Sequence, residues 1–243
     1  MEQISIFLLS SERSGSNLIR DRLCNYAENL CSVPPVTILR TLGYWEPLMG
    51  PFSLDSKWRE TIGYALRCCY ERAVPWDIAL SVDGIADAYE GIYGKQRSLV
   101  KLLDLLYRQF AQFKGYTGYF NKEIHLFDFA HDIERQLPHA RFIHLYRDPR
   151  DYVLSQQKRP FGNQSALDLG HLWLKECNAS LKAKNGNGVK EKTFSISYEQ
   201  FIQNEKPSLK QIGDFFGIKA AIKKRSQDIA AGNYKYLSKN DAN

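Results

Sequence analysis

The sequence predicts a single α/β domain over residues 1–243, built on a central parallel sheet flanked by helices. Three short apolar segments predict its strands: residues 3–9, 140–146 and 193–197. Continuous runs of Ile, Leu and Phe are typical of parallel strands that are buried on both faces. Because helical patterns alternate with these segments, we expect parallel strands that bind ligands at their carboxyl ends.

The helices are predicted from apolar residues that recur at helical spacing. Pro138 ends one helix, and Asp148 caps another whose first residue is Pro149, where the fixed φ of proline fits. Residues 32–54 carry four prolines with aromatic residues between them, which favours a loop-rich segment. From Ala220 onward the chain is basic and polar. The other predicted helices cover residues 17–31, 56–74, 97–114, 126–137, 166–184, 199–204 and 207–216.

The composition favours a small anionic ligand over nucleic acid, a metal or a membrane. The formal net charge is +6, but the Lys and Arg residues form no dense block of the kind that binds nucleic acid. The five cysteines lack metal-binding spacing and their number is odd, which favours reduced thiols in the cytoplasm. The first apolar run is too short for a signal peptide or a membrane span, so we expect no membrane association.

The segment between the first strand and the first helix, residues 11–17 (SERSGSN), is the most informative part of the chain. A strand, a turn of small residues and a helix form an anion cradle, because backbone N–H groups and the helix dipole converge there. Aligned with the nucleotide-triphosphate loop GxxxxGK[ST], the chain keeps only Gly15. Ser16 replaces the Lys and Asn17 replaces the residue that binds Mg²⁺, which argues against an ATP or GTP enzyme.

Arg13 is the cation of this loop, and Ser11, Ser14 and Ser16 supply hydroxyl groups. The sequence alone leaves a second interpretation open, in which the loop is a serine-rich turn with an exposed arginine. A phosphate cradle and a plain turn share this composition. The choice between them therefore depends on whether a second phosphate-binding site occurs elsewhere in the chain.

Arg147 and Ser155 form that second candidate site. Arg147 directly follows the strand 140–146, at the end where a parallel sheet places its ligands. Ser155 lies seven residues after the helix cap Asp148, which is almost two helical turns, so it lies on the same side of the helix as the cap. We therefore expect Arg147 and Ser155 to hold one phosphate together. The alternative for Arg147 is a surface ion pair with Asp148 or Asp151.

These segments resemble the sulfotransferases that depend on PAPS (3′-phosphoadenosine 5′-phosphosulfate). In that family the first strand, loop and helix hold the 5′-phosphosulfate, which residues 11–17 match, and an Arg and a Ser eight positions apart hold the 3′-phosphate. Residues 140–155 are similar to that second motif. Residues 197–201 (SYEQF), followed by 212–218, resemble a third, whose tyrosine, here Tyr198, approaches the adenine.

The resemblance spans residues 4–218 and is weakest over 32–120. It implies a P-loop-like α/β domain, PAPS as co-substrate, PAP (adenosine 3′,5′-bisphosphate) as product, and no metal. Many cytosolic members carry Lys at the position of Arg13, whereas other members carry Arg. The positive charge is kept, but Arg binds with a planar fork rather than a point charge.

The resemblance also implies an in-line transfer in which charge builds on the oxygen between sulfur and the leaving phosphate. Arg13 is the expected cation at that oxygen, supported by the backbone amides of Gly15, Ser16 and Asn17. Lys122 is a second cation, expected at a neighbouring strand end.

The general base is expected to be His125, because it lies 22 residues before Arg147, the separation that cytosolic sulfotransferases show. Glu46, in the aromatic loop 43–47, is the rival, since other branches of the family use a Glu after the first helix. A packed histidine and an exposed loop carboxylate are the plain alternatives for the two residues, and Asp83 is a weaker third candidate.

The acceptor is expected to be the hydroxyl or amine of a small molecule, for example a natural product such as a saxitoxin-type toxin. Aromatic residues in loops are candidates for its wall: Tyr44, Trp45, Tyr64 and Trp76. Two other functions stay open at this point. One is a P-loop kinase for a small molecule, and the other is a nucleotide-binding module without catalysis.

Overall fold

The computed structural model describes residues 4–49, 51–72, 74–159 and 164–221. Its centre is a sheet of five parallel strands in the order β2-β3-β1-β4-β5, as the sequence predicts for the fold class. The strands are β1 (Ser5–Ser10), β2 (Leu30–Ser32), β3 (Gly118–Asn121), β4 (Ala140–Tyr146) and β5 (Thr193–Ser197).

Strand β1 lies at the middle of the sheet and all six of its residues are buried. It pairs with β3 on one side, where Phe7 lies opposite Asn121, and with β4 on the other, where Ser10 lies opposite Leu145. The chain fills one half of the sheet before it crosses to the other half. The loops after β1 and β4 therefore meet at the point where the strand order reverses, which is where open α/β sheets bind ligands.

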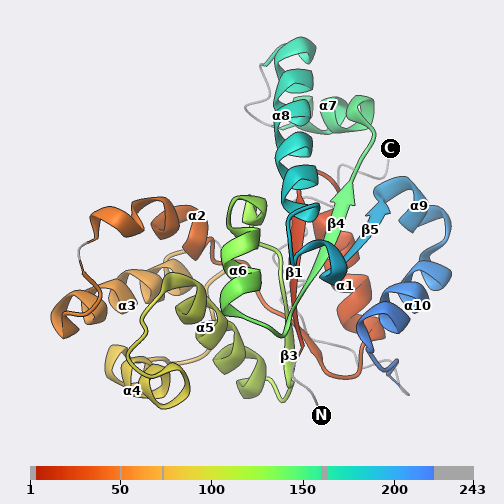
Figure 1. Cartoon of the computed structure of the whole chain (residues 1–243). Helices are drawn as coiled ribbons and strands as arrows, with labels where there is room; N and C mark the ends of the chain where they lie inside the picture. The colour runs from red at the N-terminus through yellow and green to blue at the C-terminus, as the bar shows by residue number, and fades with distance from the viewer. Residues whose placement is uncertain (1–3, 50, 73, 160–163, 222–243) are drawn as a thin grey trace.

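Helices cover both faces of the sheet (Figure 1). Alternate residues of β1 serve the two cores: Phe7 and Leu9 face one, whereas Ile6 and Leu8 face the other. The first core contains α2 (Ile38–Leu42), α3 (Asp55–Tyr70), α4 (Val82–Tyr93), α5 (Leu99–Phe113) and α6 (Ala130–Gln136), and the second contains α1 (Ser16–Tyr26), α9 (Tyr198–Gln203) and α10 (Glu205–Phe216).

The remaining helices begin beyond the carboxyl end of the sheet. Helix α7 (Pro149–Gln157) follows β4, and α8 (Ala166–Lys184) packs beside it and projects beyond the sheet (Figure 1). The second half of α8 packs against β1 and β4. Asp148 caps α7 by accepting the Arg150 backbone N–H, as predicted. Three short 3₁₀ helices complete the described structure: η1 (Gly43–Leu48), η2 (Leu126–Phe129) and η3 (Lys190–Lys192).

The predicted elements 140–146, 166–184 and 193–197 match the structure residue for residue. The helix predicted over 17–31 is wrong in its second part, because α1 ends at Tyr26 and the three-residue strand β2 follows. Helix α4 was missed, since its two glycines weaken the helical signal. The segment 32–54 is less irregular than expected, and most of the basic segment after Ala220 lies outside the described residues.

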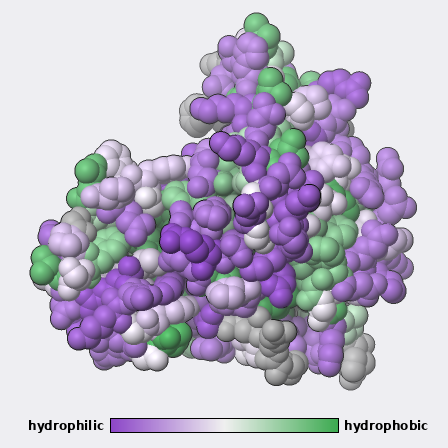
Figure 2. Space-filling view, in the orientation of Figure 1, coloured by the Kyte–Doolittle hydropathy of each residue, from purple (hydrophilic) through white to green (hydrophobic). Residues whose placement is uncertain are grey.

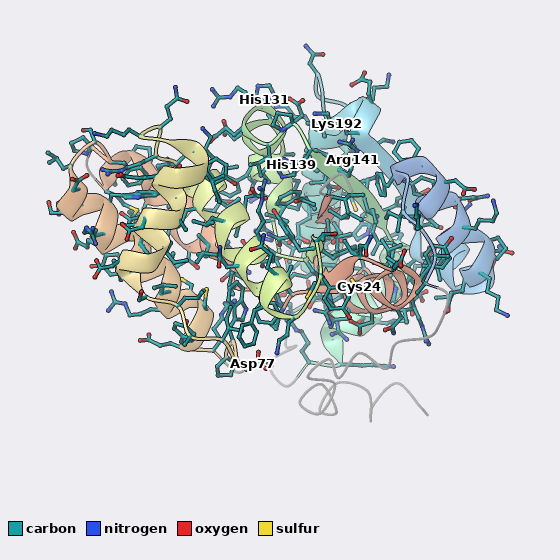
Figure 3. The ribbon with its side chains drawn as sticks, turned by 90° about the horizontal axis from the view of Figure 1, so that it is seen from below. Cys24, Asp77, His131, His139, Arg141 and Lys192 are labelled. Carbon is teal, nitrogen blue, oxygen red and sulfur yellow. The ribbon has the colours of Figure 1, made fainter. Side chains whose placement is uncertain are left out.

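The surface in the orientation of Figure 2 is mostly hydrophilic, with small scattered hydrophobic groups. Figure 3 views the molecule from the end where the strands begin, with His139 and Arg141 at the start of β4. A small cavity of about 230 Å³ opens there, away from the loops after β1 and β4. Within the ranges given above, no helix combines the length and apolar character needed to cross a membrane.

Candidate functional site

The loop after β1 curves around one point because two of its residues have left-handed backbones. Arg13 has a φ of 59° and Gly15 a φ of 87°, and α1 begins directly after Gly15. A Cβ at Gly15 would lie 2.2 Å from Cδ2 of Tyr198, so the ring packs where only glycine leaves room. The hydroxyls of Ser11 and Ser14 bond each other at 2.6 Å in the interior of the loop. The loop thus presents backbone amides at a helix N-terminus, the arrangement that binds phosphate.

Arg147 extends from the end of β4 to this loop. Its Nη1 donates to the backbone carbonyl of Arg13 at 3.0 Å, and its guanidinium stacks on the ring of Tyr198, 4.4 Å from the ring centre. The ion pair with Asp148 or Asp151 does not form; Asp148 pairs with Arg150 instead. Nε of Arg147 is buried and has no hydrogen-bond partner in the described chain. A buried donor without a partner is costly, and an anion at this point would satisfy it.

Ser155 lies on α7 and faces the loop. Its Oγ accepts a hydrogen bond from Nε of Arg13 at 2.8 Å. The sequence assigned these residues to two separate phosphates, whereas the structure joins them directly. The two candidate phosphate sites are therefore neighbours that share a contact, and Arg13 points toward α7.

Lys122 follows the last residue of β3, at the strand end that the sequence predicts. Its Nζ donates to Oδ1 of Asn17 at 2.7 Å, which connects β3 to the first turn of α1. Burial, together with the nearby charges of Arg20 and Arg13, lowers the pKa of Lys122 to about 8. An anion beside Lys122 would favour the charged ammonium and raise this pKa.

His125 and Glu46, the two candidates for the base, have different surroundings. His125 is half-buried, has a left-handed backbone with φ 66°, and places Nε2 3.2 Å from Oε1 of Glu176. It lies one residue beyond Ile124, which lines the cavity described below. Glu46 lies in η1 and accepts the backbone N–H of Leu99 at the start of α5; burial raises the pKa of its carboxyl. The third candidate, Asp83, pairs with Arg59 on the surface.

The aromatic residues proposed for an acceptor wall do not form one cluster. Trp76 is buried in the core and its Nε1 donates to the carbonyl of Pro34, so its assignment to the wall is wrong. Tyr44 and Trp45 are exposed near one another on η1, and Tyr64 is exposed beside Arg67.

A cavity of about 730 Å³ opens at the carboxyl end of the sheet, between the loops after β1, β3 and β4. This volume is that of a site for a cofactor-sized ligand. Ser14, His125 and Glu46 are absent from the residues that line it. Those predicted from the sequence that do line it are Ser11, Arg13, Gly15, Ser16, Asn17, Lys122, Arg147, Ser155 and Tyr198.

Sequence reasoning gave no role to two glutamates that line this cavity, Glu12 and Glu123, or to Glu176, which accepts the backbone N–H of Glu12. Glu12 pairs with Arg159 at 3.0 Å and with Arg40 at 3.6 Å. Glu123 and Glu176 are buried at 2% and 6% exposure. Glutamates are usually exposed, and burial arises from tertiary contacts, so the sequence carried no signal that set these residues apart.

Glu123 joins β3 to α2. Its carboxylate accepts the backbone N–H groups of Ile38 at 3.1 Å and Leu39 at 3.3 Å, while Tyr107 approaches at 3.4 Å. Burial raises the pKa of Glu123 to about 7, although the hydrogen bonds oppose this effect. In the described chain, no group of three or more His, Cys, Asp or Glu residues is arranged to hold a metal ion.

Comparison with known proteins identifies the family. The model of the sulfotransferase family matches residues 5–221. The chain belongs to the sulfotransferase family. No curated protein matches it significantly.

Two solved structures have the same fold at low sequence identity. The sulfotransferase domain from the curacin biosynthetic pathway is 17% identical, with a TM-score of 0.55 over 91% of this chain and 76% of that one. The sulfotransferase domain from the Synechococcus PCC 7002 olefin synthase is 22% identical, with a TM-score of 0.51 over 90% of this chain and 74% of that one. The predicted P-loop-like α/β fold is confirmed.

Proposed function

We propose that this sulfotransferase moves a sulfuryl group from PAPS to a hydroxyl or amine of a small molecule. The observation that carries the proposal is one cavity lined by both phosphate-binding motifs, Arg13 with its loop and Arg147 with Ser155. PAPS carries phosphate groups on both the 3′ and the 5′ positions of its ribose, so it needs two such cation sites a short distance apart. The missing loop lysine and Mg²⁺-binding hydroxyl disfavour the kinase alternative.

The residues present fit this donor. The backbone amides of Gly15, Ser16 and Asn17 would hold the 5′-phosphosulfate at the start of α1. The partnerless Nε of Arg147 would hold the 3′-phosphate with the hydroxyl of Ser155, and Tyr198 would lie against the adenine. Ser155 then exchanges the Nε of Arg13 for a phosphate oxygen, which frees Arg13 for the phosphosulfate.

The chemistry needs cations at the leaving phosphate and a base at the acceptor. Arg13 and Lys122 stabilise the charge that builds on the oxygen between sulfur and phosphorus. His125 removes the acceptor proton in this proposal, and its carboxylate partner supports that role. Glu46 remains the rival, although its carboxylate is engaged by the start of α5.

The proposal includes a role in the synthesis of a natural product, with a saxitoxin-type toxin as one candidate acceptor. The first of the two similar structures is named for a biosynthetic pathway, which supports this role. The five free cysteines support a reducing, cytoplasmic setting.

The donor is tested by thermal unfolding with PAP and with ATP and Mg²⁺. A ligand that binds the folded state raises the midpoint, so PAP alone should raise it without metal. A shift with ATP and Mg²⁺ but none with PAP would support the kinase. A shift with PAP and no turnover of PAPS across an acceptor screen would identify a module without catalysis.

The base is tested by comparing His125→Ala with Glu46→Gln. We expect His125→Ala to lower kcat at least 100-fold while the affinity for PAP changes less than threefold. Glu46→Gln keeps an oxygen for the Leu99 N–H and should keep activity within threefold. The opposite ranking would transfer the role of base to Glu46.

A further inference from the structure

Glu176 is a buried carboxylate that the donor-binding motifs leave unused. It lies in the middle of α8, is 6% exposed, and uses both of its oxygens. Oε2 accepts the backbone N–H of Glu12 in the loop after β1 at 3.3 Å, and Oε1 lies 3.2 Å from Nε2 of His125. One side chain therefore contacts both the phosphate loop and the candidate base.

A carboxylate beside one imidazole nitrogen determines where the proton of the ring lies. An ionised carboxylate only accepts hydrogen bonds, so the neighbouring Nε2 must carry the proton. The other nitrogen, Nδ1, then holds a lone pair, and it has no hydrogen-bond partner among the residues that the structure describes. A ring in this tautomer can accept a proton at Nδ1, and the carboxylate stabilises the imidazolium that results.

The surroundings of Glu176 differ from those of the other buried carboxylate near the site. Glu123 is held by two backbone N–H groups of α2 and by Tyr107, none of which belongs to the phosphate loop. Glu176 has one backbone donor, and its second partner is a half-buried ring with a strained, left-handed backbone. Strain of this kind persists where the surrounding structure holds a residue in place, and it is concentrated at functional sites.

We infer that Glu176 is the positioning residue of the base, holding His125 with its proton on Nε2 and aligning the ring with the phosphate loop. The inference rests on the proposed function and deepens it. The same carboxylate holds the Glu12 amide, so the position of the loop and the tautomer of the base are set together. Proton acceptance at Nδ1 of His125 converts the ring to imidazolium, whose Nε2–H remains bonded to Glu176.

Glu176→Gln tests this with little change in shape. The amide oxygen of Gln can still accept the Glu12 N–H, whereas its NH₂ group donates toward His125 and favours the proton on Nδ1. We expect kcat to fall at least tenfold while the KM for PAPS stays within threefold. The tautomer is read directly from the ¹⁵N shifts of the His125 ring, which should report Nε2–H in the wild type and Nδ1–H in the variant.

Glu134→Gln is the control. Glu134 is also a half-buried carboxylate with a side-chain partner, since it accepts a hydrogen bond from Lys192 at 2.9 Å, but it has no histidine partner among the described contacts and does not line the cavity. It should keep kcat within threefold and leave the His125 shifts unchanged. Combining Glu176→Gln with His125→Ala should cost no more than His125→Ala alone, since Glu176 acts through the ring.

Two outcomes would overturn the inference: a wild-type His125 protonated on Nδ1, or a Glu176→Gln variant that retains kcat within twofold. Unfolding of Glu176→Gln is excluded separately by its melting curve and by PAP binding. Failure of the proposed function has a different signature, because wild-type protein would then lack PAPS turnover while the ¹⁵N shifts still report the tautomer.

Discussion

The proposed donor side of the cavity and the helical region over α2 to α5 are built in different ways. The proposed donor side, formed by the loops after β1 and β4, consists of backbone amides and side chains at strand ends. The helical region contributes none of the described residues that line the cavity, and it is a packed core with buried aromatic residues such as Trp58, Trp76 and Tyr89. Glu123 connects the two regions, because it lines the cavity and accepts two backbone N–H groups of α2. The first region is built from short local segments, whereas the second depends on tertiary packing.

The largest effect on PAP affinity should come from removing Arg147, whose buried Nε has no hydrogen-bond partner in the described chain. Arg147→Ala should weaken PAP binding about 100-fold, or about 2.7 kcal/mol, because hydrogen bonds to charged groups contribute this much. Isothermal titration calorimetry measures the change. Arg150→Ala is the control, since Arg150 is exposed and forms its ion pair with Asp148, and it should change affinity less than threefold. Similar losses in both variants would mean that general charge, not the site, attracts PAP.

Gly15, in the loop after β1, should tolerate substitution by alanine less well than Gly91, in the helical region. Gly15→Ala places a methyl group against Tyr198 at positive φ, and should lower the free energy of unfolding by about 2 kcal/mol. Gly91→Ala, in α4, meets no atom within 4 Å and should raise it by up to about 1 kcal/mol. Chemical denaturation measures both, and a stable Gly15→Ala would show that the loop can shift away from Tyr198.

The sequence predicted the backbone elements of the proposed donor side well because their signals are local. The strand 140–146, the cap Asp148 and the proline after it define one strand, loop and helix, and they place Arg147 without knowledge of any other segment. The positive φ of Arg13 and its contact with Ser155 could not be predicted, because they depend on how α7 packs against the loop.

Which residues of the helical region are buried was harder to predict, for a physical reason. Trp76 and Tyr44 have similar aromatic character in sequence, yet the first is buried and the second exposed. A side chain becomes core or surface through contacts with distant elements, and the pattern of residues 32–120 does not record those contacts. The strand β2 is too short to carry a period, so it was absorbed into the predicted helix.

The contribution of Glu123 to the stability of the fold should depend on pH, since Glu123 connects the two regions through its contacts with α2. The pKa of Glu123 is about 7 in the folded state, above its ordinary value of 4.5, so the folded state binds the proton more tightly than the unfolded state. Stability from this group is complete below pH 4.5 and is lost as the pH rises through 7. Glu123→Gln should reduce the fall in unfolding free energy between pH 5 and 8 by on the order of 2 kcal/mol. Equal slopes in urea denaturation of the two proteins would contradict this.

The smallest effect is expected at Lys122, in the proposed donor site. Its contribution to stability changes with pH in the opposite direction to that of Glu123. Burial lowers its pKa to about 8, so the unfolded state binds this proton more tightly and stability from the group rises between about pH 8 and 10.5. PAP favours the charged ammonium and raises this pKa, so binding takes up a proton above pH 8. Affinity for PAP should therefore be constant near pH 7 and fall about tenfold by pH 9.5, one pKa unit or about 1.4 kcal/mol.

Lys122→Arg separates this effect from the titration of other groups. Arginine stays charged throughout the range, so the variant should bind PAP with an affinity that is nearly independent of pH. Lys122→Met should also lose the pH dependence, but at a uniformly lower affinity. A variant that keeps the wild-type slope would assign the titration to another residue and would show that PAP does not contact Lys122, which would leave Arg13 as the cation at the reacting phosphate.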